Sequence, residues 1–273
     1  LFYFFLPIFY FGQENIQKST DSLLIVENER LRNVLSREDL INWNNNIAKK
    51  CSSKNYPKGE ALAYINIGNL LWGNFQFEES LKNLKKAENI ITQKNIEDDY
   101  VKGKLNIEYA QLYNYMDLPD LAIKYCNQSI NYFSNLSGVK NRRALTYAYG
   151  CNSIYYYKVK KNNLALKSLK NAIKLIPTPL DVSNIAYHYT SIQYNKDSAD
   201  FYFKKAFELT NSSNFKFDYY QKAVVFMHYS NFLIIEKKYN EALINLLKTK
   251  TIIEQSKNKY LKLELYNSYL LCI

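Results

Sequence analysis

The chain has 273 residues, of which 47% are hydrophobic and 22% charged, so its composition excludes an intrinsically disordered protein. Only 7 glycines and 5 prolines are present, which leaves few positions for sharp turns and predicts long helices with short connections. The formal net charge is +11, but the lysines are spread along predicted helix faces, so we interpret them as a solvated surface and expect no direct nucleic-acid binding.

An almost purely apolar run, Leu1 to Gly12, opens the sequence. It is shorter than the roughly 20 residues that cross a bilayer, and it resembles the hydrophobic region and small-residue exit of a secretory signal. Tyr10 is bulkier than the residue usual at its position in such signals. We expect residues 1–13 to be the remnant of a signal peptide and the protein to be exported to the periplasmic side of a bacterial membrane. The alternatives are a truncated membrane anchor or a buried first helix, and a cytoplasmic location.

The pattern of residues 14–57 is helical but irregular. Apolar residues over 21–35 predict one helix, and Ser36 followed by Asp39 indicates the N-cap of a second helix that runs through Cys51. We expect these two helices to form an atypical N-terminal helical cap on a stack of repeats.

Residues 58–257 repeat one pattern, in which each copy has two apolar-periodic segments. The five copies cover about 61–94, 103–136, 146–179, 183–213 and 223–256. Small residues of the two segments are 12 positions apart in four of these copies, from 68 to 80, 110 to 122, 153 to 165 and 230 to 242. Small side chains let two helix backbones approach, so this spacing predicts a close crossing within each hairpin.

Two parts of the sequence depart from this pattern. In the fourth copy the small residues at 190 and 199 are only 9 apart, which predicts an inter-helix turn at 195–197 that is shorter by about one helical turn. Residues 258–273 are expected to form the first helix of a truncated sixth repeat.

The first copy carries the residues of a known repeat. Its first segment has Tyr64, Ile67, Gly68 and Leu71, and its second has Ser80, Leu84, Ala87 and Thr92. This arrangement resembles the tetratricopeptide repeat (TPR), with an aromatic residue, Leu-Gly and Tyr on the first helix and Ala, a large apolar residue and Ala on the second. The resemblance implies an all-α fold, a right-handed α-solenoid of stacked antiparallel helical hairpins.

The repeats are longer than is usual for this family. Small residues of the second segments lie at 80, 122, 165, 199 and 242, so most intervals exceed the usual length of about 34 residues. Such long repeats are similar to the sensory TPR region of bacterial membrane-bound transcriptional regulators.

The resemblance also implies a ligand surface, the concave face lined by the first helices, at positions near 2, 5, 6, 9 and 12 of each repeat, of which we use positions 6, 9 and 12. The candidate binding residues at these positions are Asn66, Asn69, Trp72, Glu108, Gln111, Asn114, Tyr157, His188, Ser191, Tyr194, His228 and Asn231. A row of uncharged hydrogen-bonding groups with aromatic neighbours suits the backbone of an extended peptide or a partner helix. The alternative is that these side chains satisfy one another inside the stack. The clamp for a terminal carboxylate in co-chaperone members is not reproduced, since only Lys104 and Lys158 fall near this face.

Histidines and cysteines offer little for a metal site. His188 and His228 occupy matching places in successive repeats, and we interpret them as a structural position and not as a pH-sensitive or metal-binding pair, because no acidic or cysteine ligand accompanies them. The four cysteines, Cys51, Cys126, Cys151 and Cys272, are far apart without zinc-ligand spacing, so we expect buried thiols. We expect no metal and no cofactor.

The sequence contains no phosphate-binding glycine loop, nucleophile elbow or zinc-protease motif. We therefore predict a non-catalytic module that binds a protein or peptide. The resemblance further implies the extracytoplasmic sensor part of a larger bacterial signalling or transcription regulator, tied to the membrane only through flanking segments. A stand-alone TPR scaffold or adaptor for complex assembly is the alternative, and the oligomeric state stays open.

Overall fold

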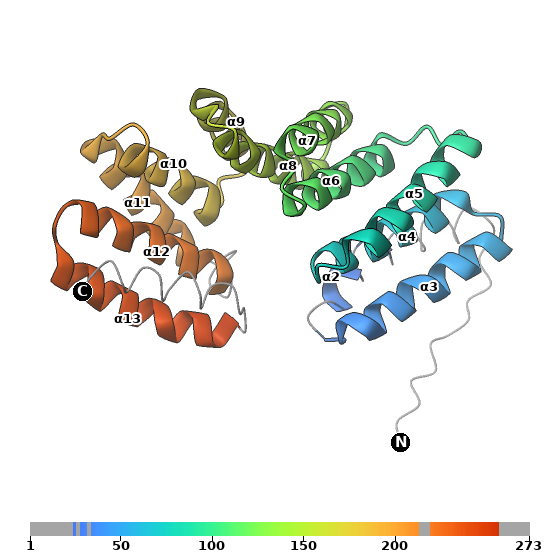
Figure 1. Cartoon of the computed structure of the whole chain (residues 1–273), viewed down its shortest axis with the longest axis horizontal. Helices are drawn as coiled ribbons and strands as arrows, with labels where there is room; N and C mark the ends of the chain where they lie inside the picture. The colour runs from blue at the N-terminus through green and yellow to red at the C-terminus, as the bar shows by residue number, and fades with distance from the viewer. Residues whose placement is uncertain (1–23, 26–27, 32–33, 213–218, 257–273) are drawn as a thin grey trace, which may run out of the picture. The chain divides into compact units, whose positions relative to one another are not determined.

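The structure, a computed structural model, describes residues 24–25, 28–31, 34–212 and 219–256, and all regular elements in these ranges are helices (Figure 1). The chain divides into two compact units, a first unit over Leu1–Leu136 and a second unit over Ser137–Ile273. The predicted segments 1–13 and 258–273 lie outside the described residues. Within the described ranges, no helix combines the length and the apolar character that a membrane crossing requires.

The first unit contains a short helix, a single long helix and two hairpins. Ser36 caps the single long helix, α3, as predicted, because its side chain accepts from the Asp39 N–H at 3.1 Å. Helix α3 packs on the first hairpin, α4–α5, whose two helices also contact α6 of the next hairpin, α6–α7. The elements are α2 (Asn28–Leu31), α3 (Arg37–Ser53), α4 (Pro57–Trp72), α5 (Phe77–Gln93), α6 (Asp99–Tyr115) and α7 (Pro119–Ser134).

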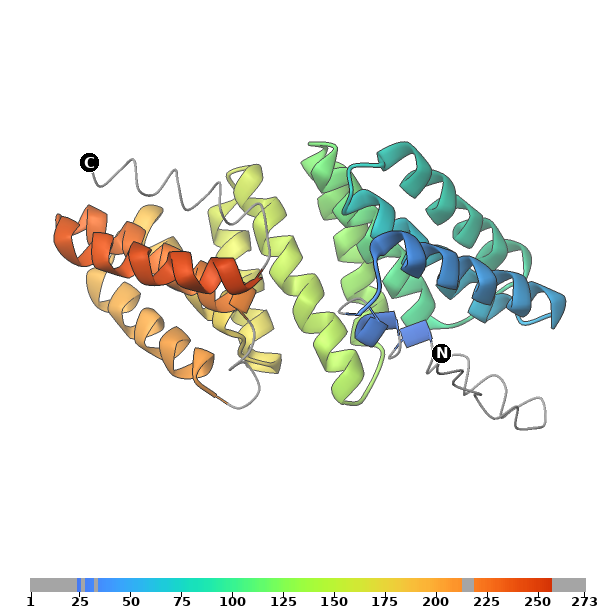
Figure 2. The ribbon, with the colours of Figure 1, turned by 90° about the horizontal axis from the view of Figure 1, so that it is seen from below.

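The second unit contains the hairpins α8–α9, α10–α11 and α12–α13, seen from a second direction in Figure 2. Helix α10 contacts α9, the second helix of the preceding hairpin, and α12, the first helix of the following hairpin, so the three hairpins stack in chain order. The all-α class and the stacked antiparallel hairpins are thus confirmed within each unit. The elements are α8 (Val139–Lys158), α9 (Asn162–Leu175), α10 (Pro179–Ser191), α11 (Lys196–Thr210), α12 (Tyr219–Ile235) and α13 (Tyr239–Ser256).

Close backbone contact between the two helices of a hairpin explains the small residues. Ser80 of α5 donates its hydroxyl to the carbonyl of Gly68 in α4 at 2.8 Å, and Ser129 of α7 makes the same bond to Gly103 in α6 at 2.8 Å. A Cβ atom on Gly68 would lie only 2.5 Å from Cδ2 of the fully buried Leu84. In the first hairpin the spacing of 12 residues therefore marks the crossing of the two helices, whereas the bonded pair of the second hairpin is 26 residues apart, and both pairs serve packing.

Four of the turns within hairpins share one C-cap geometry. A residue two or three positions after the end of each first helix adopts a left-handed conformation, at Phe75 (φ 61), Asp117 (φ 58), Lys160 (φ 57) and Lys237 (φ 59). The next residue bonds back across the turn, as Lys161 N–H does to the Tyr156 carbonyl at 2.9 Å. This Schellman-type geometry satisfies the last carbonyls of the first helix and sets the direction of the second.

The hairpin α10–α11 differs in the length of its first helix. Helix α10 ends at Ser191, one residue after the small residue Thr190, whereas α8 ends at Lys158, five residues after Ser153. The connection at 192–195 is no shorter than the one at 73–76 between α4 and α5. The prediction of a shortened turn at 195–197 is therefore wrong, because the missing residues belong to the last turn of α10.

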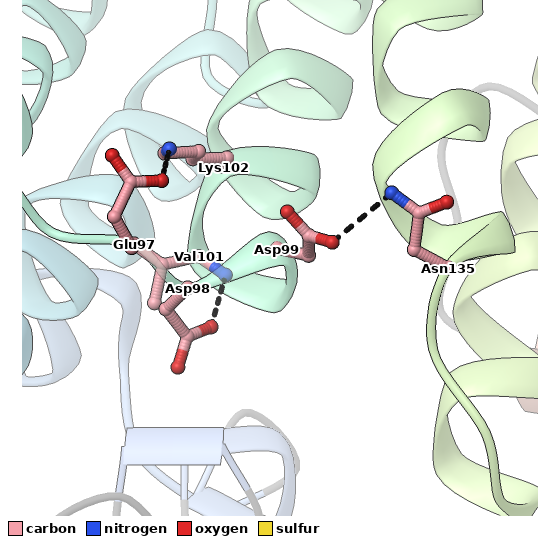
Figure 3. A network of polar contacts seen from close by, with 6 residues as sticks. All are labelled: Glu97, Asp98, Asp99, Val101, Lys102 and Asn135. Carbon is pink, nitrogen blue, oxygen red and sulfur yellow. Dashed lines mark hydrogen bonds and ion pairs between the residues drawn. The ribbon is translucent and has the colours of Figure 1, made fainter.

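The start of α6 is held by the polar network in Figure 3, and one of its members, Asp98, also bonds to α4. Asp98 caps α6 by accepting from the Val101 N–H at 3.0 Å, and its other oxygen pairs with Lys58 of α4 at 2.7 Å. Burial would raise the pKa of Asp98, but the hydrogen bonds and the charge of Lys58 outweigh it, so the pKa is lowered. Two further contacts flank this cap: Lys102 to Glu97 at 2.5 Å and Asn135 to Asp99 at 3.1 Å.

We predict that Gly68→Leu destabilises the first unit by about 1–3 kcal/mol, because the new side chain overpacks the crossing against Leu84. Gly73→Leu is the matched control, since a Cβ atom on Gly73 would meet only backbone oxygens at 3.5 Å or more. Urea unfolding of both variants tests this prediction. Equal losses at the two positions would contradict the packing role of Gly68.

We predict that Lys160→Gly stabilises the second unit by about 0.5–1 kcal/mol, because glycine adopts the left-handed backbone conformation of this residue without steric cost. Lys167→Gly, at an exposed position inside α9, should instead cost about 1 kcal/mol of helix propensity. Thermal unfolding of the two variants should show shifts of opposite sign. A destabilised Lys160→Gly variant would show that the turn geometry is misassigned.

Candidate functional site

The predicted binding residues lie on the first helices, and in the first unit three of them form one hydrogen-bonded network. Glu108 of α6 is only 5% exposed, and its Oε2 accepts from Asn69 Nδ2 at 2.6 Å and from Trp72 Nε1 at 3.0 Å. The indole of Trp72 stacks on the ring of Tyr115, with centroids 5.0 Å apart. These side chains join α4 to α6 and use much of their hydrogen-bonding capacity within the fold.

Asn66 belongs to a second, deeper network that joins the first three helices. Its amide nitrogen donates to the Leu24 carbonyl at 3.0 Å and to Asn44 Oδ1 at 3.2 Å. Asn44 in turn donates to Asn28 Oδ1 at 2.9 Å. Asn66 is fully buried, so its contacts are structural ones. Gln111 and Asn114 lie half-buried further along α6.

In the second unit, Tyr157 of α8 and His188 of α10 form the corresponding pair. The Tyr157 hydroxyl lies 3.0 Å from His188 Nδ1, and His188 Nε2 lies 3.5 Å from Gln193 Oε1. Burial lowers the pKa of His188 and raises the pKa of Tyr157, so both are neutral at pH 7 and the hydroxyl donates to Nδ1. Position 12 of one first helix thus bonds to position 6 of the next, as Trp72 does to Glu108.

The pair that should follow, Tyr194 and His228, does not form. Tyr194 occupies position 12 of its repeat, but α10 has already ended at Ser191. The exposed Tyr194 hydroxyl donates to Glu236 instead, and the second oxygen of Glu236 pairs with Lys196 at 2.8 Å. Because α10 ends early, His228 lacks the tyrosine partner that His188 has in the preceding repeat.

His228 has one satisfied and one unsatisfied ring nitrogen. Its ring lies 5.0 Å from that of Tyr187, and it bonds to the backbone of Ser183 in α10. The residue is partly exposed, but Nδ1 is shielded from solvent and has no hydrogen-bond partner in the described part of the chain. Burial lowers the pKa of His228 to about 4, so the imidazole is neutral at pH 7. With Nε2 bonded to the Ser183 carbonyl, Nδ1 is an acceptor.

Asn231 lies one helical turn beyond His228 and presents a second acceptor. Its Oδ1 is also shielded from solvent and without a hydrogen-bond partner among the residues the structure describes. Residues three apart share one face of a helix, so the two acceptors lie on the same side of α12. A buried acceptor that stays unpaired costs about 1–3 kcal/mol. In the first unit, Asn66 Oδ1 is likewise buried without a partner in the described part of the chain. His228 Nδ1 and Asn231 Oδ1 are the predicted residues of the second unit whose bonding is left incomplete.

The structure divides the predicted residues into two groups. Eight of them interact with other groups of the fold, as the alternative interpretation expects: Asn66, Asn69, Trp72, Glu108, Gln111, Asn114, Tyr157 and His188. The other four lie in the second unit, where Ser191 and Tyr194 are exposed and His228 and Asn231 keep unpaired atoms. Whether any of them binds a ligand stays a prediction. Sequence reasoning missed Ser183, Tyr187 and Glu236, although Tyr187 lies at position 5, which the repeat also directs toward this face.

No metal site is built by the described residues, which contain no group of three His, Cys, Asp or Glu side chains able to hold an ion. The two histidines bond to Tyr157 and to Ser183. Cys51, Cys126 and Cys151 are buried thiols that form no disulfide among the described residues, as expected, and Cys272 lies outside these residues.

Comparison with known proteins shows the fold. No family model and no curated protein matches the chain. The structure of BtubC (BKLC) from P. vanneervenii superposes with a TM-score of 0.65 at 11% identity, over 82% of this chain and 93% of that one. The apo quorum sensor NprR from B. thuringiensis gives a TM-score of 0.63 at 14% identity, over 94% and 80% of the two chains. Aspartyl phosphate phosphatase F from Bacillus subtilis gives 0.62 at 15% identity, over 97% and 71%.

At these identities the likeness extends to the fold alone. The chain is a TPR-like array of helical hairpins, which confirms the predicted repeat class.

Asp181, in the first turn of α10, is a buried carboxyl group that opposes His228 in its response to pH. Thr178 Oγ1 donates to Asp181 Oδ2 at 2.8 Å and accepts from the Asp181 N–H at 3.0 Å, which caps α10. A Cβ atom on Gly150 of α8 would lie 2.8 Å from Asp181 Oδ1, so α8 encloses the carboxylate. Burial raises the pKa of Asp181 to about 6, and the bond from Thr178 offsets this only in part.

We predict that Asp181 and His228 change the free energy of unfolding in opposite directions between pH 7 and pH 4. Because the pKa of Asp181 is raised, its stabilising contribution to the free energy of unfolding is present at about pH 4 and is lost as the pH rises through about 6. Because the pKa of His228 is lowered, its contribution is present at pH 7 and is lost as the pH falls from 6.5 toward about 4. One pKa unit corresponds to about 1.4 kcal/mol, so each residue contributes about 3 kcal/mol at most.

Urea unfolding across this pH range checks the prediction in the wild type, Asp181→Asn and His228→Gln. Asp181→Asn should lose stability on acidification more steeply than the wild type, and His228→Gln less steeply. His188, whose pKa burial also lowers, is common to all three proteins and cancels in the comparison. Identical pH slopes for the three proteins would contradict the burial of these groups.

Proposed function

We propose that this chain is a non-catalytic binding module that holds a peptide, or an extended segment of a partner protein, on the first-helix face of the second unit. The observation that carries the proposal is the pair of solvent-shielded acceptors, His228 Nδ1 and Asn231 Oδ1, which have no partner in the described part of the chain. Unpaired buried acceptors destabilise the folded chain, and a ligand that donates hydrogen bonds to them removes this cost.

The chemistry of this face supports a peptide. Its groups are neutral, hydrogen-bonding and aromatic, which suits the alternating N–H and C=O groups of an extended backbone. Tyr187 and Tyr194 add aromatic surface beside His228 and at the end of α10. The shared fold of NprR, a quorum sensor, supports a role in signal recognition as part of this proposal.

We further propose that the module is exported and forms the sensor part of a larger bacterial regulator. The support is the apolar stretch Leu1 to Gly12, with its likeness to the core of a secretory signal, together with the long repeats. N-terminal sequencing of the protein recovered from the periplasm of its host tests the export step. Recovery only from the cytoplasm, with the apolar stretch retained, would contradict it and would favour a scaffold that assembles other proteins.

The binding proposal predicts that random linear peptides displayed on phage can be selected on the immobilised chain, residues 1–273. Asn231→Ala should weaken the selected peptides by about tenfold, a loss of roughly 1.4 kcal/mol, because it removes one of the two free acceptors. Asn240→Ala, an exposed asparagine on the second helix of the same hairpin, is the matched control and should change nothing.

Fluorescence anisotropy with the labelled peptides measures these affinities. Two results would overturn the proposal: no enrichment over the bare matrix, or equal binding to wild type and Asn231→Ala. Far-UV circular dichroism of the variants shows whether each remains folded.

A further inference from the structure

His188 and His228 occupy the same position of successive repeats, yet only one of them has its Nδ1 satisfied. Tyr157, on the preceding first helix, donates its hydroxyl to His188 Nδ1 at 3.0 Å. Tyr194, the counterpart of Tyr157, bonds to Glu236, and His228 Nδ1 stays without a partner in the described part of the chain. The pair at His188 thus shows that a hydroxyl donor fits beside Nδ1 at this repeat position. The described part of the chain supplies no such donor to His228.

We propose that the ligand supplies His228 with the neutral hydrogen-bond donor that the array supplies to His188, foremost a tyrosine hydroxyl, with Asn231 as the second acceptor. This inference rests on the proposed peptide-binding function and deepens it by specifying the ligand group.

The direction of the hydrogen bond follows from the partners of the imidazole. Nδ1 has no partner in the described part of the chain, so we assign the bond with the Ser183 backbone to Nε2 as donor, and the neutral imidazole then carries its lone pair on Nδ1. Asn231 Oδ1 accepts only, by its chemistry. A ligand group that presents only acceptors, such as a carboxylate, would face two lone pairs and bind poorly. A donor is therefore required.

The donor is neutral because both acceptors are neutral. An ammonium or guanidinium group would lose its hydration here without gaining an ion pair, which is costly away from water. A phenol or a carboxamide has a smaller desolvation cost, and hydrogen bonds to the two acceptors offset that cost. A phenol also extends the aromatic contacts of this region, where the Tyr187 ring already lies 5.0 Å from the His228 ring.

The early end of α10 provides the approach to His228. Tyr157 reaches His188 from the last turn of α8, and the equivalent turn is missing from α10. Residues 191–197 are exposed instead. We infer that a ligand side chain enters from this side, where a connection replaces the helical turn that covers His188 in the preceding pair.

The test uses peptides selected from the random phage library on the whole chain. We expect one peptide position to be enriched in tyrosine or in another neutral donor. Replacing that tyrosine by phenylalanine should weaken binding to the wild type by about tenfold and should leave binding to His228→Phe unchanged, because the hydroxyl has lost its acceptor there. Tyr239→Phe, at an exposed position on the second helix of the same hairpin, is the control on the protein side and should bind the original peptide as the wild type does.

The outcomes separate this inference from the function on which it rests. Peptides that are weakened by Asn231→Ala but tolerate the loss of every donor side chain would overturn the inference and leave the binding function standing. Enrichment of lysine or arginine at the sensitive position would also overturn it. If no peptide is selected, both fall. If the change from tyrosine to phenylalanine in the peptide weakened binding equally to the wild type and to His228→Phe, the hydroxyl would bond elsewhere and the inference would be overturned.

Discussion

A polar side chain buried between two helices must find a hydrogen-bond partner, and the first helices of this protein meet that demand by bonding to one another. Trp72 reaches Glu108 at 3.0 Å, and Tyr157 reaches His188 at 3.0 Å, each from the last turn of one first helix to position 6 of the next repeat. The pattern needs first helices of a fixed length. Where α10 ends early, the donor is lost and His228 keeps an unpaired acceptor. The candidate site is therefore a consequence of helix length and not of an unusual residue type.

The hairpins themselves depend on a second constraint, the close crossing of two backbones. Serine hydroxyls on the second helix bond to glycine carbonyls on the first, at Ser80 and Gly68 and again at Ser129 and Gly103. Small residues are needed at these crossings, and in the first hairpin the bonded pair has the predicted spacing of 12 residues. The sequence therefore predicts the hairpins and their crossing points, and the cap at Ser36 as well, because these depend on local residue patterns.

The site could be predicted only in part. The repeat pattern correctly directs attention to the first helices, but it treats equivalent positions alike and so grouped His188 with His228. Their difference depends on where α10 ends, and the spacing of 190 to 199 indicated a deletion without showing whether it fell in the turn or in the helix. Pairings such as Asn69 with Glu108 or Tyr194 with Glu236 join residues 39 and 42 positions apart, and no local pattern predicts them.

The most direct measurement is the nitrogen-15 NMR spectrum of the imidazole groups, which is simple to assign because the chain contains only 2 histidines. In the free protein the Nδ1 resonance of His188 should show a hydrogen-bonded acceptor and that of His228 a free one. Tyr157→Phe should move the His188 resonance to the position of the other, and Tyr194→Phe should move neither. A His228 resonance that already shows a hydrogen bond, and that shifts in Tyr194→Phe, would contradict the assignment of His228 Nδ1 as the acceptor left open by the early end of α10.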